Sequence, residues 1–349
     1  MRNSVSRLRP LDLKQDVVDM PFGAGGRATA QLIDEVFAKA FHNEYLAQGH
    51  DGARMPPLAG PLVTACDAHV VHPLIFPGGD IGRLAVCGTV NDVAVCGAKP
   101  LYLTASFILE EGLSLALLET VVNSMAATAR EAGVLIVTGD TKVVERGRGD
   151  GVYIATTGIG EAYPGIVING RNAQPGDAVL VTGTLGDHGL TILSLREGLA
   201  FDGALKSDCA PLSDLVSRLV ESLGDRIHVL RDPTRGGLAT TLNEIARESQ
   251  VGIDLTEAAL PVREVVQAGC EFLGLDPLYV ANEGKLVVIV RDEVKNDALS
   301  LIARHPLGRD AAIVGRVTDR HPEEVHLLTR LGGRRYVDWL NSDPLPRIC

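Results

Sequence analysis

Apolar side chains recur at helical spacing near the start of the chain. Over residues 29–42 they fall three and four positions apart, which is the spacing of one face of an α-helix. These positions are Leu32, Ile33, Val36, Phe37, Ala40 and Phe41. A glycine-rich stretch at residues 23–26 precedes them and favours a turn. We therefore expect a turn that leads into a helix, after a polar and loosely ordered segment over residues 1–20.

The rest of the chain alternates short apolar runs with longer amphipathic segments. The runs predict buried strands and the segments predict helices. Strands are expected at residues 62–71, 133–138, 152–160, 178–182, 227–230 and 286–290, and helices at about 80–96, 188–196, 214–223 and 238–249. Asp80 is expected to be the N-cap of the helix that follows it. Mixed strands and helices in both halves predict an α/β fold with a duplicated plan.

A loop over residues 163–176 divides the chain into two halves. A length of 349 residues is too great for one typical core and fits two domains. We expect an N-terminal domain over residues 21–165, a C-terminal domain over residues 176–335 and a mobile tail over residues 336–349. Pro344 and Pro346 disfavour helix in this tail, which should be an extended, semi-stiff arm.

Composition and charge narrow the classes of protein. Apolar residues make up 46% of the chain and charged residues 22%, as in a packed globular protein. The formal net charge of -11, without a run of Lys or Arg, disfavours binding to nucleic acid or to an anionic membrane. No run of apolar residues is long enough for a membrane span, and the first residues do not resemble a signal peptide. The expected location is the cytoplasm.

Two aspartates interrupt apolar patterns. Asp67 lies in a predicted strand, where a buried carboxylate needs a partner such as a cation. An exposed strand end or a hydrogen-bonded structural role explains it equally well. Asp92 shares a helix face with Ala85 and Gly88, whose small side chains let another group approach. A bound ligand explains Asp92 better than the alternative, a cap at a frayed helix end.

Three polar segments lie where α/β proteins bind ligands. Residues 139–142, Gly-Asp-Thr-Lys, follow a predicted strand, and Lys142 could bind a phosphate. A solvated turn is an equal alternative. Residues 231–237 hold the equivalent place in the second half, where amides at a helix start suit an anion. Residues 282–285, taken alone, resemble an ordinary hairpin turn.

Several motifs of known chemistry are lacking in the sequence. The glycines at residues 23–26 follow no convincing strand, so they are a weak dinucleotide fingerprint, and no P-loop occurs. His69 and His72 fit no standard zinc spacing. The six cysteines include no Cys-x-x-Cys pair. Cys349 differs from the others because it is the last residue, so that a thiol on an arm could be modified and then delivered to another site; the alternative is an accidental terminal cysteine.

Six segments together resemble the HypE family of hydrogenase maturation factors, in the superfamily of aminoimidazole ribonucleotide synthetase (PurM) and selenophosphate synthetase. They are residues 76–82, 88–92, 137–144, 231–237, 281–285 and 346–349, and the resemblance extends from about residue 22 to residue 349. It implies a PurM-like two-domain fold with an N-terminal ATP-binding domain built on a mixed sheet and a C-terminal α/β sandwich domain. It also implies a homodimer formed through the N-terminal sheets.

The resemblance implies ATP-dependent chemistry on Cys349. A carbamoyltransferase, HypF, would load a carbamoyl group onto this cysteine, and the chain would dehydrate it to a thiocyanate with ATP and Mg²⁺. The cyano group would pass to iron on the HypC-HypD complex for the nickel-iron hydrogenase. Another ATP-dependent amide or selenide phosphorylation is disfavoured by the terminal thiol and by the absence of an N-terminal reactive cysteine. A non-catalytic carrier is disfavoured by the acids and Lys142.

The resemblance also implies roles for individual residues. Magnesium on the triphosphate would be held by Asp67, Asp80, Asp92 and Asp232, and further nucleotide contacts would come from Asn91, Gly139, Asp140 and Thr141. Glu283 would be the base that removes the N–H proton. Lys142 would stabilise the phosphoryl group or orient the thiocarbamate, and Cys349 would carry the substrate.

Overall fold

The first half of the chain forms a four-stranded sheet. The computed structural model describes residues 9–199, 205–340 and 346–349. The strands of this sheet are β1 (Leu62–His69), β4 (Ala98–Glu110), β5 (Leu135–Val144) and β6 (Val152–Ala162), in the order β1-β6-β4-β5. β4 and β5 are parallel, and the other pairs are antiparallel. The short strands β2 (Ile75–Phe76) and β3 (Gly79–Asp80) pair beside it.

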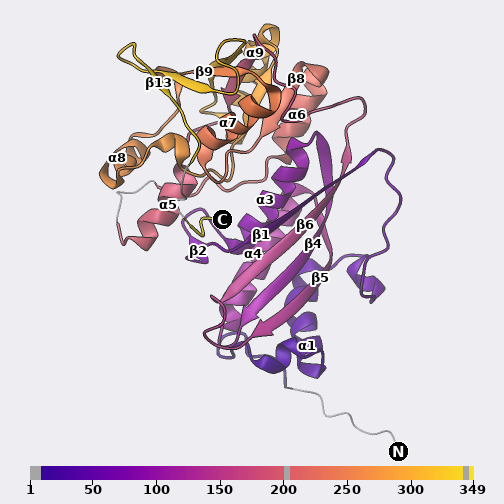
Figure 1. Cartoon of the computed structure of the whole chain (residues 1–349). Coiled ribbons are helices and arrows are strands. Elements are labelled where there is room, and N and C mark those ends of the chain that lie inside the picture. The colour runs from indigo at the N-terminus through magenta and orange to yellow at the C-terminus, as the bar shows by residue number, and fades with distance from the viewer. Residues whose placement is uncertain (1–8, 200–204, 341–345) are drawn as a thin grey trace, which may run out of the picture.

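Two helices, α3 (Ile81–Val95) and α4 (Leu115–Ala132), cover one face of this sheet (Figure 1). The alternation of buried and less buried residues along β6 shows that only one face is covered. Gly82 lets the two helices approach closely, because a Cβ atom there would lie 2.2 Å from the carbonyl oxygen of Val121. The N-terminal helical stretch comprises α1 (Arg27–Leu32), a π-helical turn (Ile33–Phe37) and α2 (Ala38–Phe41).

The second half forms a seven-stranded sheet with helices on both faces. Its strands are β7 (Ala178–Val181), β8 (Ile227–Arg231), β9 (Gly252–Thr256), β10 (Val287–Val290), β11 (Ala312–Thr318), β12 (Val325–Leu328) and β13 (Arg334–Tyr336), in the order β13-β12-β9-β11-β7-β10-β8. Helices α6 (Ser213–Leu223) and α9 (Lys295–Arg304) pack on one face, and α7 (Gly237–Ser249) packs on the other. Every residue of β7 and β10 is buried, as expected for central strands covered on both sides.

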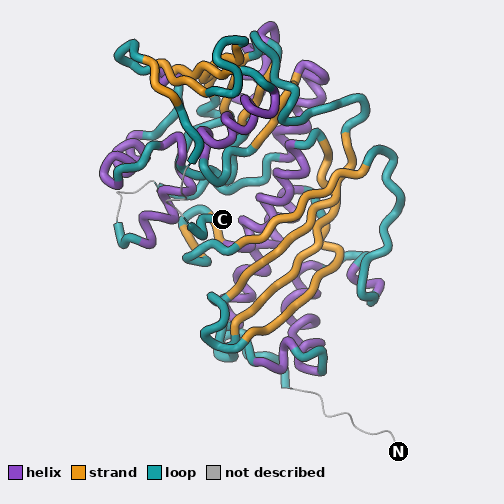
Figure 2. Tube along the Cα trace, viewed as in Figure 1, coloured by secondary structure: helices purple, strands orange, loops and turns teal. Residues whose placement is uncertain are grey.

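The two halves share an apolar cluster. Helices α5 (Asp187–Arg196) and α8 (Glu264–Leu273) belong to the second half, yet their buried residues pack in the same cluster as α3, α4 and β4. Ile348 joins this cluster, so the end of the chain lies between the two sheets, beside β1, β2 and α5 (Figures 1 and 2). Short 3-10 turns complete the structure at Met20–Gly23, Leu46–Gln48, Gly224–Arg226, Glu257–Ala259, Pro277–Tyr279, Asp292–Val294 and Pro306–Gly308.

The predicted α/β fold, with a mixed sheet in the N-terminal half and an α/β arrangement in the C-terminal half, is confirmed, and two local expectations are wrong. Residues 139–142 are not a turn after a strand, because β5 continues through them to Val144. Residues 282–285 are not a hairpin, because the strand that follows them, β10, pairs with β7 and β8. Residues 341–345 of the predicted tail lie outside the described residues. Among the helices that the structure describes, none is long and apolar enough to cross a membrane.

Candidate active site

Asp67 lies on the face of β1 that is turned toward helix α3. It pairs in the sheet with Thr156 of β6, and the Thr156 hydroxyl donates a hydrogen bond to the carbonyl oxygen of Ala85 in α3, at 3.1 Å. Oδ2 of Asp67 is 3.6 Å from Nε2 of His69. A Cβ atom at Gly88 would lie 3.1 Å from this Oδ2. The glycine therefore lets the carboxylate approach the backbone of α3.

Asp92 and Asp232 bring two more carboxylates to Asp67. Asp92 follows Gly88 by about one turn of α3, so it lies on the same side of the helix. Burial, followed by the negative charges of Asp232 and Asp67, raises the pKa of Asp92 to about 7. Burial raises the pKa of Asp232, just after β8, to about 6, and Asp67 acts in the same direction. Acids from both halves of the chain thus lie close enough to repel one another.

The three acids fit a magnesium ion. Magnesium prefers hard oxygen ligands such as carboxylates, and an opposite charge would offset the repulsion that raises the pKa of Asp92 and of Asp232. Asp67, Asp92 and Asp232 are the described residues that would hold it.

Glu283 adds a buried carboxyl group beside these acids. Its side chain is 3% exposed, and Oε1 has no hydrogen-bond partner among the described residues. Burial raises the pKa of Glu283 well above its ordinary value, and nearby groups that include Asp232, Asp208 and Asp67 act in the same direction. An acid in this setting can exchange a proton with a bound ligand.

Asp208 holds the backbone on which Glu283 lies. Its carboxylate accepts hydrogen bonds from the amides of Glu283 at 3.1 Å and Gly284 at 3.2 Å, and Nζ of Lys285 lies 3.2 Å from its Oδ2. A Cβ atom at Gly284 would lie 1.9 Å from the carbonyl oxygen of Asp208, so only glycine fits this approach. The sequence interpretation did not identify Asp208, since it lies in a segment without a regular pattern.

Asn91 and Asp80 have structural partners. The Asn91 amide donates to the carbonyl oxygen of Ala210 at 3.1 Å and accepts from the amide of Leu212 at 2.7 Å. Oδ1 of Asp80 accepts from the amides of Gly82 at 2.7 Å and Arg83 at 3.0 Å, which confirms the predicted N-cap. Twelve helical residues at 1.5 Å per residue place Asp80 roughly 18 Å from Asp92 along the helix axis. The structure therefore does not bring Asp80 to the other three acids.

Lys142 and Asp140 lie on the other edge and the other face of the four-stranded sheet. β5 is separated from β1 by two strands, which corresponds to about 14 Å at the usual strand spacing. Across the sheet, Asp140 pairs with Ser106, Ser106 with Ala155, and Ala155 with Ala68. Paired residues point to the same side of a sheet, so Asp140 and Ala68 share the open face, which is the face that α3 and α4 do not cover. Ala68 adjoins Asp67 and points to the opposite side. Within one chain, Lys142 is therefore not brought to the acids of α3 and β1.

Lys142 instead forms an ion pair with Asp140. Its Nζ lies 2.6 Å and 2.5 Å from the two carboxylate oxygens, and this contact lowers the pKa of Asp140. Gly139, Asp140 and Thr141 line a cavity of about 370 Å³ under the N-terminal helical stretch, together with Phe37 and Phe41 among others. A flat apolar group would fit this cavity beside polar backbone.

Cys349 lies at the end of β1 that follows Asp67. Its main-chain oxygen accepts a hydrogen bond from the amide of Val70 at 3.1 Å. Val70 is three residues beyond Asp67, about 10 Å along an extended strand. Cys349 is half-buried and packs against the apolar cluster shared by the two halves. The last residue of the chain is thus near the acids that come from both halves.

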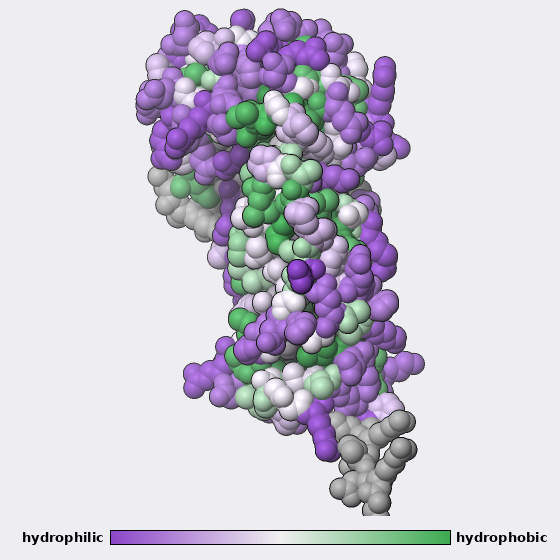
Figure 3. Space-filling model, turned by 90° about the vertical axis from the view of Figure 1, so that its right-hand side faces the viewer, coloured by the Kyte–Doolittle hydropathy of each residue, from purple (hydrophilic) through white to green (hydrophobic). Residues whose placement is uncertain are grey.

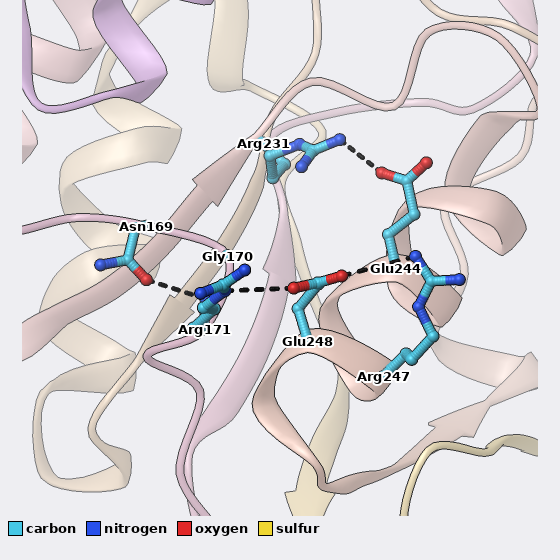
Figure 4. Close-up of a pocket in the computed structure, with 7 residues that line it drawn as sticks. All are labelled: Asn169, Gly170, Arg171, Arg231, Glu244, Arg247 and Glu248. Atoms are coloured by element: carbon cyan, nitrogen blue, oxygen red, sulfur yellow. Dashed lines mark hydrogen bonds and ion pairs between the residues drawn. The ribbon is translucent and has the colours of Figure 1, made fainter.

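A second cavity, of about 560 Å³, lies beside Asp232 but contains none of the predicted site residues (Figure 4). Arg231 in its wall pairs with Glu244, at 2.5 Å. Arg171 pairs with Glu248, at 3.1 Å. The charges in this cavity therefore largely neutralise one another.

Comparisons with known proteins agree with this architecture. The AIR synthase related protein, N-terminal domain, matches residues 49–162, and the corresponding C-terminal domain matches residues 174–327. The two matches define the chain as an AIR synthase-related protein. The carbamoyl dehydratase HypE of Cupriavidus necator is 58% identical over 342 residues, which cover 98% of this chain and 97% of that protein. The chain belongs to the HypE family.

Two solved structures are similar over most of the chain. A hydrogenase maturation protein HypE in complex with ATP is 52% identical, with a TM-score of 0.92, and the match covers 95% of this chain and 99% of that one. A chain of a HypE-HypF complex is 51% identical, with a TM-score of 0.78, and the match covers 88% and 99% of the two chains.

Proposed function

We propose that the chain is a carbamoyl dehydratase that uses ATP to convert an S-carbamoyl group on its own Cys349 into an S-cyanide. The proposal is supported by one combination of features: besides burial, the charges of Asp232 and Asp67 raise the pKa of both Asp92 and Glu283, Oε1 of Glu283 has no hydrogen-bond partner among the described residues, and Cys349 accepts a hydrogen bond from Val70, three residues beyond Asp67. The similar HypE solved with ATP and the relatives named carbamoyl dehydratase support it.

In this proposal Asp67, Asp92 and Asp232 hold the magnesium that accompanies the triphosphate. Bound magnesium would offset the negative charge that gathers during phosphoryl transfer. The cavity lined by Gly139, Asp140 and Thr141 lies at the opposite edge of the sheet from these acids, so any part of the nucleotide that it receives would belong to a nucleotide held by the acids of a second copy. Asn91 keeps α3, and with it Asp92, in place through its hydrogen bonds to Ala210, Leu212 and the carbonyl oxygen of Glu283.

The chemistry requires that an amide oxygen becomes a good leaving group. The γ-phosphoryl group of ATP passes to the carbamoyl oxygen, and the nitrogen loses one proton. The nitrogen then loses its second proton, the C–O bond breaks, and phosphate leaves with both electrons of that bond. The products are the thiocyanate of Cys349, ADP and phosphate, so the cysteine adduct has lost one water.

Glu283 is suited to remove the second proton. A carboxylate with a raised pKa is a stronger base than an ordinary one. The charges of Asp232 and Asp67 contribute to this pKa. Neutralising those two acids therefore favours the ionised form of Glu283 that the step needs.

The proposal includes partners that supply and remove the group. A HypF-type carbamoyltransferase would load the carbamoyl group onto Cys349, and the similar chain solved in a HypE-HypF complex supports this. The resemblance to the HypE family supports the HypC-HypD complex as the acceptor of cyanide.

A homodimer would form through the open face of the four-stranded sheet. Leu62, Ile108 and Leu135 expose 63%, 43% and 41% of their surface on this sheet, and apolar residues gather along the middle of the molecule in Figure 3. Monomeric proteins rarely expose large contiguous apolar patches. Because Lys142 and the three acids lie on opposite faces of one chain, the lysine would have to act on the site of a second copy.

Intact mass tests the proposed reaction. Protein carbamoylated at Cys349 is incubated with Mg²⁺ and ATP, and loss of one water from its mass is expected. An unchanged mass in protein that still binds ATP would favour a non-catalytic carrier instead. Glu283→Gln should prevent the loss while ATP still binds, whereas Glu293→Gln, an exposed control in the same half, should lose water normally. Full activity of Glu283→Gln would remove Glu283 from the mechanism.

A further inference from the structure

A histidine and an aspartate lie side by side on the seven-stranded sheet. His326 of β12 pairs with Asp254 of β9 in the register of the sheet, so the two side chains point to the same side. Val325 and Leu327, the neighbours of His326 in β12, are buried in the apolar cluster that includes α7. His326 and Asp254 therefore point away from α7, at the end of the sheet where β9 and β13 are labelled in Figure 1.

A second histidine joins them from the turn that precedes β12. Nε2 of His321 lies 3.1 Å from Oδ1 of Asp254, and its ring stacks on that of His326, with the centroids 4.0 Å apart and an interplanar angle of 7°. The φ angle of His321 is 42°, in the left-handed region that residues other than glycine rarely adopt. The turn thus accepts an unfavourable backbone conformation where it brings this ring to the other two side chains.

The three side chains can act as ligands of one metal ion. Their possible ligand atoms all lie within 4.8 Å of one another. Glu324 adds a fourth group, since its Oε2 is 2.8 Å from Nε2 of His326. The histidine side chains are 14% and 24% exposed, so an ion can reach them and is still sheltered. Two imidazoles with two carboxylates suit Zn²⁺ and similar transition ions, whereas Mg²⁺ prefers oxygen ligands alone.

Neighbouring groups support these ligands. Nη2 of Arg320 lies 2.6 Å from Oδ2 of Asp254, which leaves Oδ1 directed toward His321. Nδ1 of His321 is buried without a hydrogen-bond partner among the described residues. A Cβ atom at Gly252 would lie 2.7 Å from this Nδ1 and 2.0 Å from the carbonyl oxygen of Arg320, so both atoms are close to the same point. A metal-bound imidazole commonly donates its other N–H group to a carbonyl oxygen of this kind.

This cluster is separate from the acids of the candidate active site. Asp232 follows β8, and β9 is four strands away from β8 in the sheet. Four steps at the usual strand spacing correspond to roughly 19 Å. An ion bound by the two histidines would therefore not touch the magnesium and the triphosphate of the proposed reaction.

We propose that Asp254, His321 and His326, together with Glu324, form a binding site for a divalent transition ion such as Zn²⁺. The ion would fasten the turn over residues 319–324 to β9 and β12. Because the two stacked rings are parallel, they must turn toward one another to bind the same ion. This inference goes beyond the proposed function. The alternative is a stack of hydrogen-bonded side chains that holds the turn without any ion.

Calorimetric titration of the full chain with Zn²⁺ tests the site. The protein is first treated with a chelator and then kept in excess Mg²⁺, so that the acid site does not compete for Zn²⁺. Replacement of an outer-shell partner typically costs 10–100-fold in metal affinity. Loss of a ligand should cost at least as much, so His326→Gln and Asp254→Asn should each weaken Zn²⁺ binding about tenfold or more. Asn at position 254 can still accept a hydrogen bond from Arg320, which preserves the fold of the turn.

His305→Gln is the matched control. Nε2 of His305 also lies 3.1 Å from an aspartate oxygen, that of Asp214, but in the described part of the chain His305 belongs to no group of three possible ligands. This variant should bind Zn²⁺ like the wild type. The cysteines, which can bind Zn²⁺ as well, are the same in all four proteins, so the differences between them report on the cluster.

Two further measurements separate an ion site from a hydrogen-bonded stack. Zn²⁺ should shift the imidazole NMR signals of both His321 and His326, because both rings turn and bind the ion. It should also raise the Tm of the wild type and of His305→Gln, and raise that of His326→Gln less.

Equal Zn²⁺ affinities in the wild type, His326→Gln and Asp254→Asn would overturn the site. Imidazole signals of His321 and His326 that do not change at saturating Zn²⁺ would overturn it as well, in favour of the hydrogen-bonded stack. None of these measurements requires ATP or a carbamoyl group. They can therefore fail or succeed independently of the dehydratase proposal.

Discussion

Replacing Asp92 by Asn should stabilise the protein without ligand and weaken its binding of magnesium and ATP. The folded protein raises the pKa of Asp92 from 3.8 to about 7, so between these values the folded state binds more protons than the unfolded state. Stability then falls as pH rises through this window. At pH 8 Asp92 is charged, and it lowers the free energy of unfolding the most.

The magnitude follows from the same shift. Each tenfold change in proton affinity is worth about 1.4 kcal/mol, so Asp92 costs at most roughly 4 kcal/mol at pH 8. Because the repulsion is shared with Asp232 and Asp67 and the side chain is half-buried, about half of this, ~2 kcal/mol, is a reasonable expectation. Such a gain should raise the Tm by roughly 4–8 °C for a domain of this size.

Thermal unfolding at pH 8, with and without Mg²⁺ and ATP, measures both effects. Asp92→Asn should unfold at a higher temperature than the wild type without ligand and gain less from the ligands. Asp80→Asn is the control, because Asn caps a helix about as well as Asp and Asp80 is distant from the three acids; it should keep the full gain from the ligands. A lower Tm of Asp92→Asn without ligand, or an undiminished gain with ligand, would refute the reasoning.

Two further predictions concern the acids and the open sheet face. Binding of Mg²⁺ and ATP should strengthen from pH 5 to pH 8, because Asp232 and Asp92, with pKa values of about 6 and about 7, must lose their protons. Calorimetry in buffers of different ionisation enthalpy should show this proton release. Binding that does not depend on pH would contradict the acid site. Ile108→Glu should convert the expected dimer into a monomer in sedimentation experiments, while Glu293→Gln should not; a monomeric wild type would contradict the sheet-to-sheet dimer.

The sequence predicted much of the fold because the apolar patterns of its elements are strong. The helix after Asp80 and the runs at β6, β7 and β10 appear close to where they were expected. The strand β4 and the helix α4 were not predicted. The expected end of the strand at residue 138 was wrong, and so was the alternative of a solvated turn over residues 139–142. Glycine and aspartate favour turns locally, whereas pairing with β4 keeps this segment extended.

The acids of the site could be predicted individually, but their grouping could not. Asp67 and Asp92 are visible as breaks in apolar patterns, and burial beside other acids raises the pKa of Asp92. The resemblance gives Asp80 the same expected role as a magnesium ligand. However, Asp80 lies at the N-terminal end of α3, whereas Asp92 lies near its C-terminal end. Asp208 acts through contacts with residues 283 and 284, which are distant from it in the sequence, and no local pattern indicates such contacts.

The hydrogen bonds of the Asn91 amide have a consequence for motion. They tie the helix that carries Asp92 to residues 210–212 of the other half, in a place closed to water. Moving the two halves apart would leave these buried polar atoms without partners, at a cost of about 1–3 kcal/mol for each group. The two halves should therefore keep their relative position during the catalytic cycle. The part that moves should be the short C-terminal peptide, which carries its sulfur into the cleft and out again.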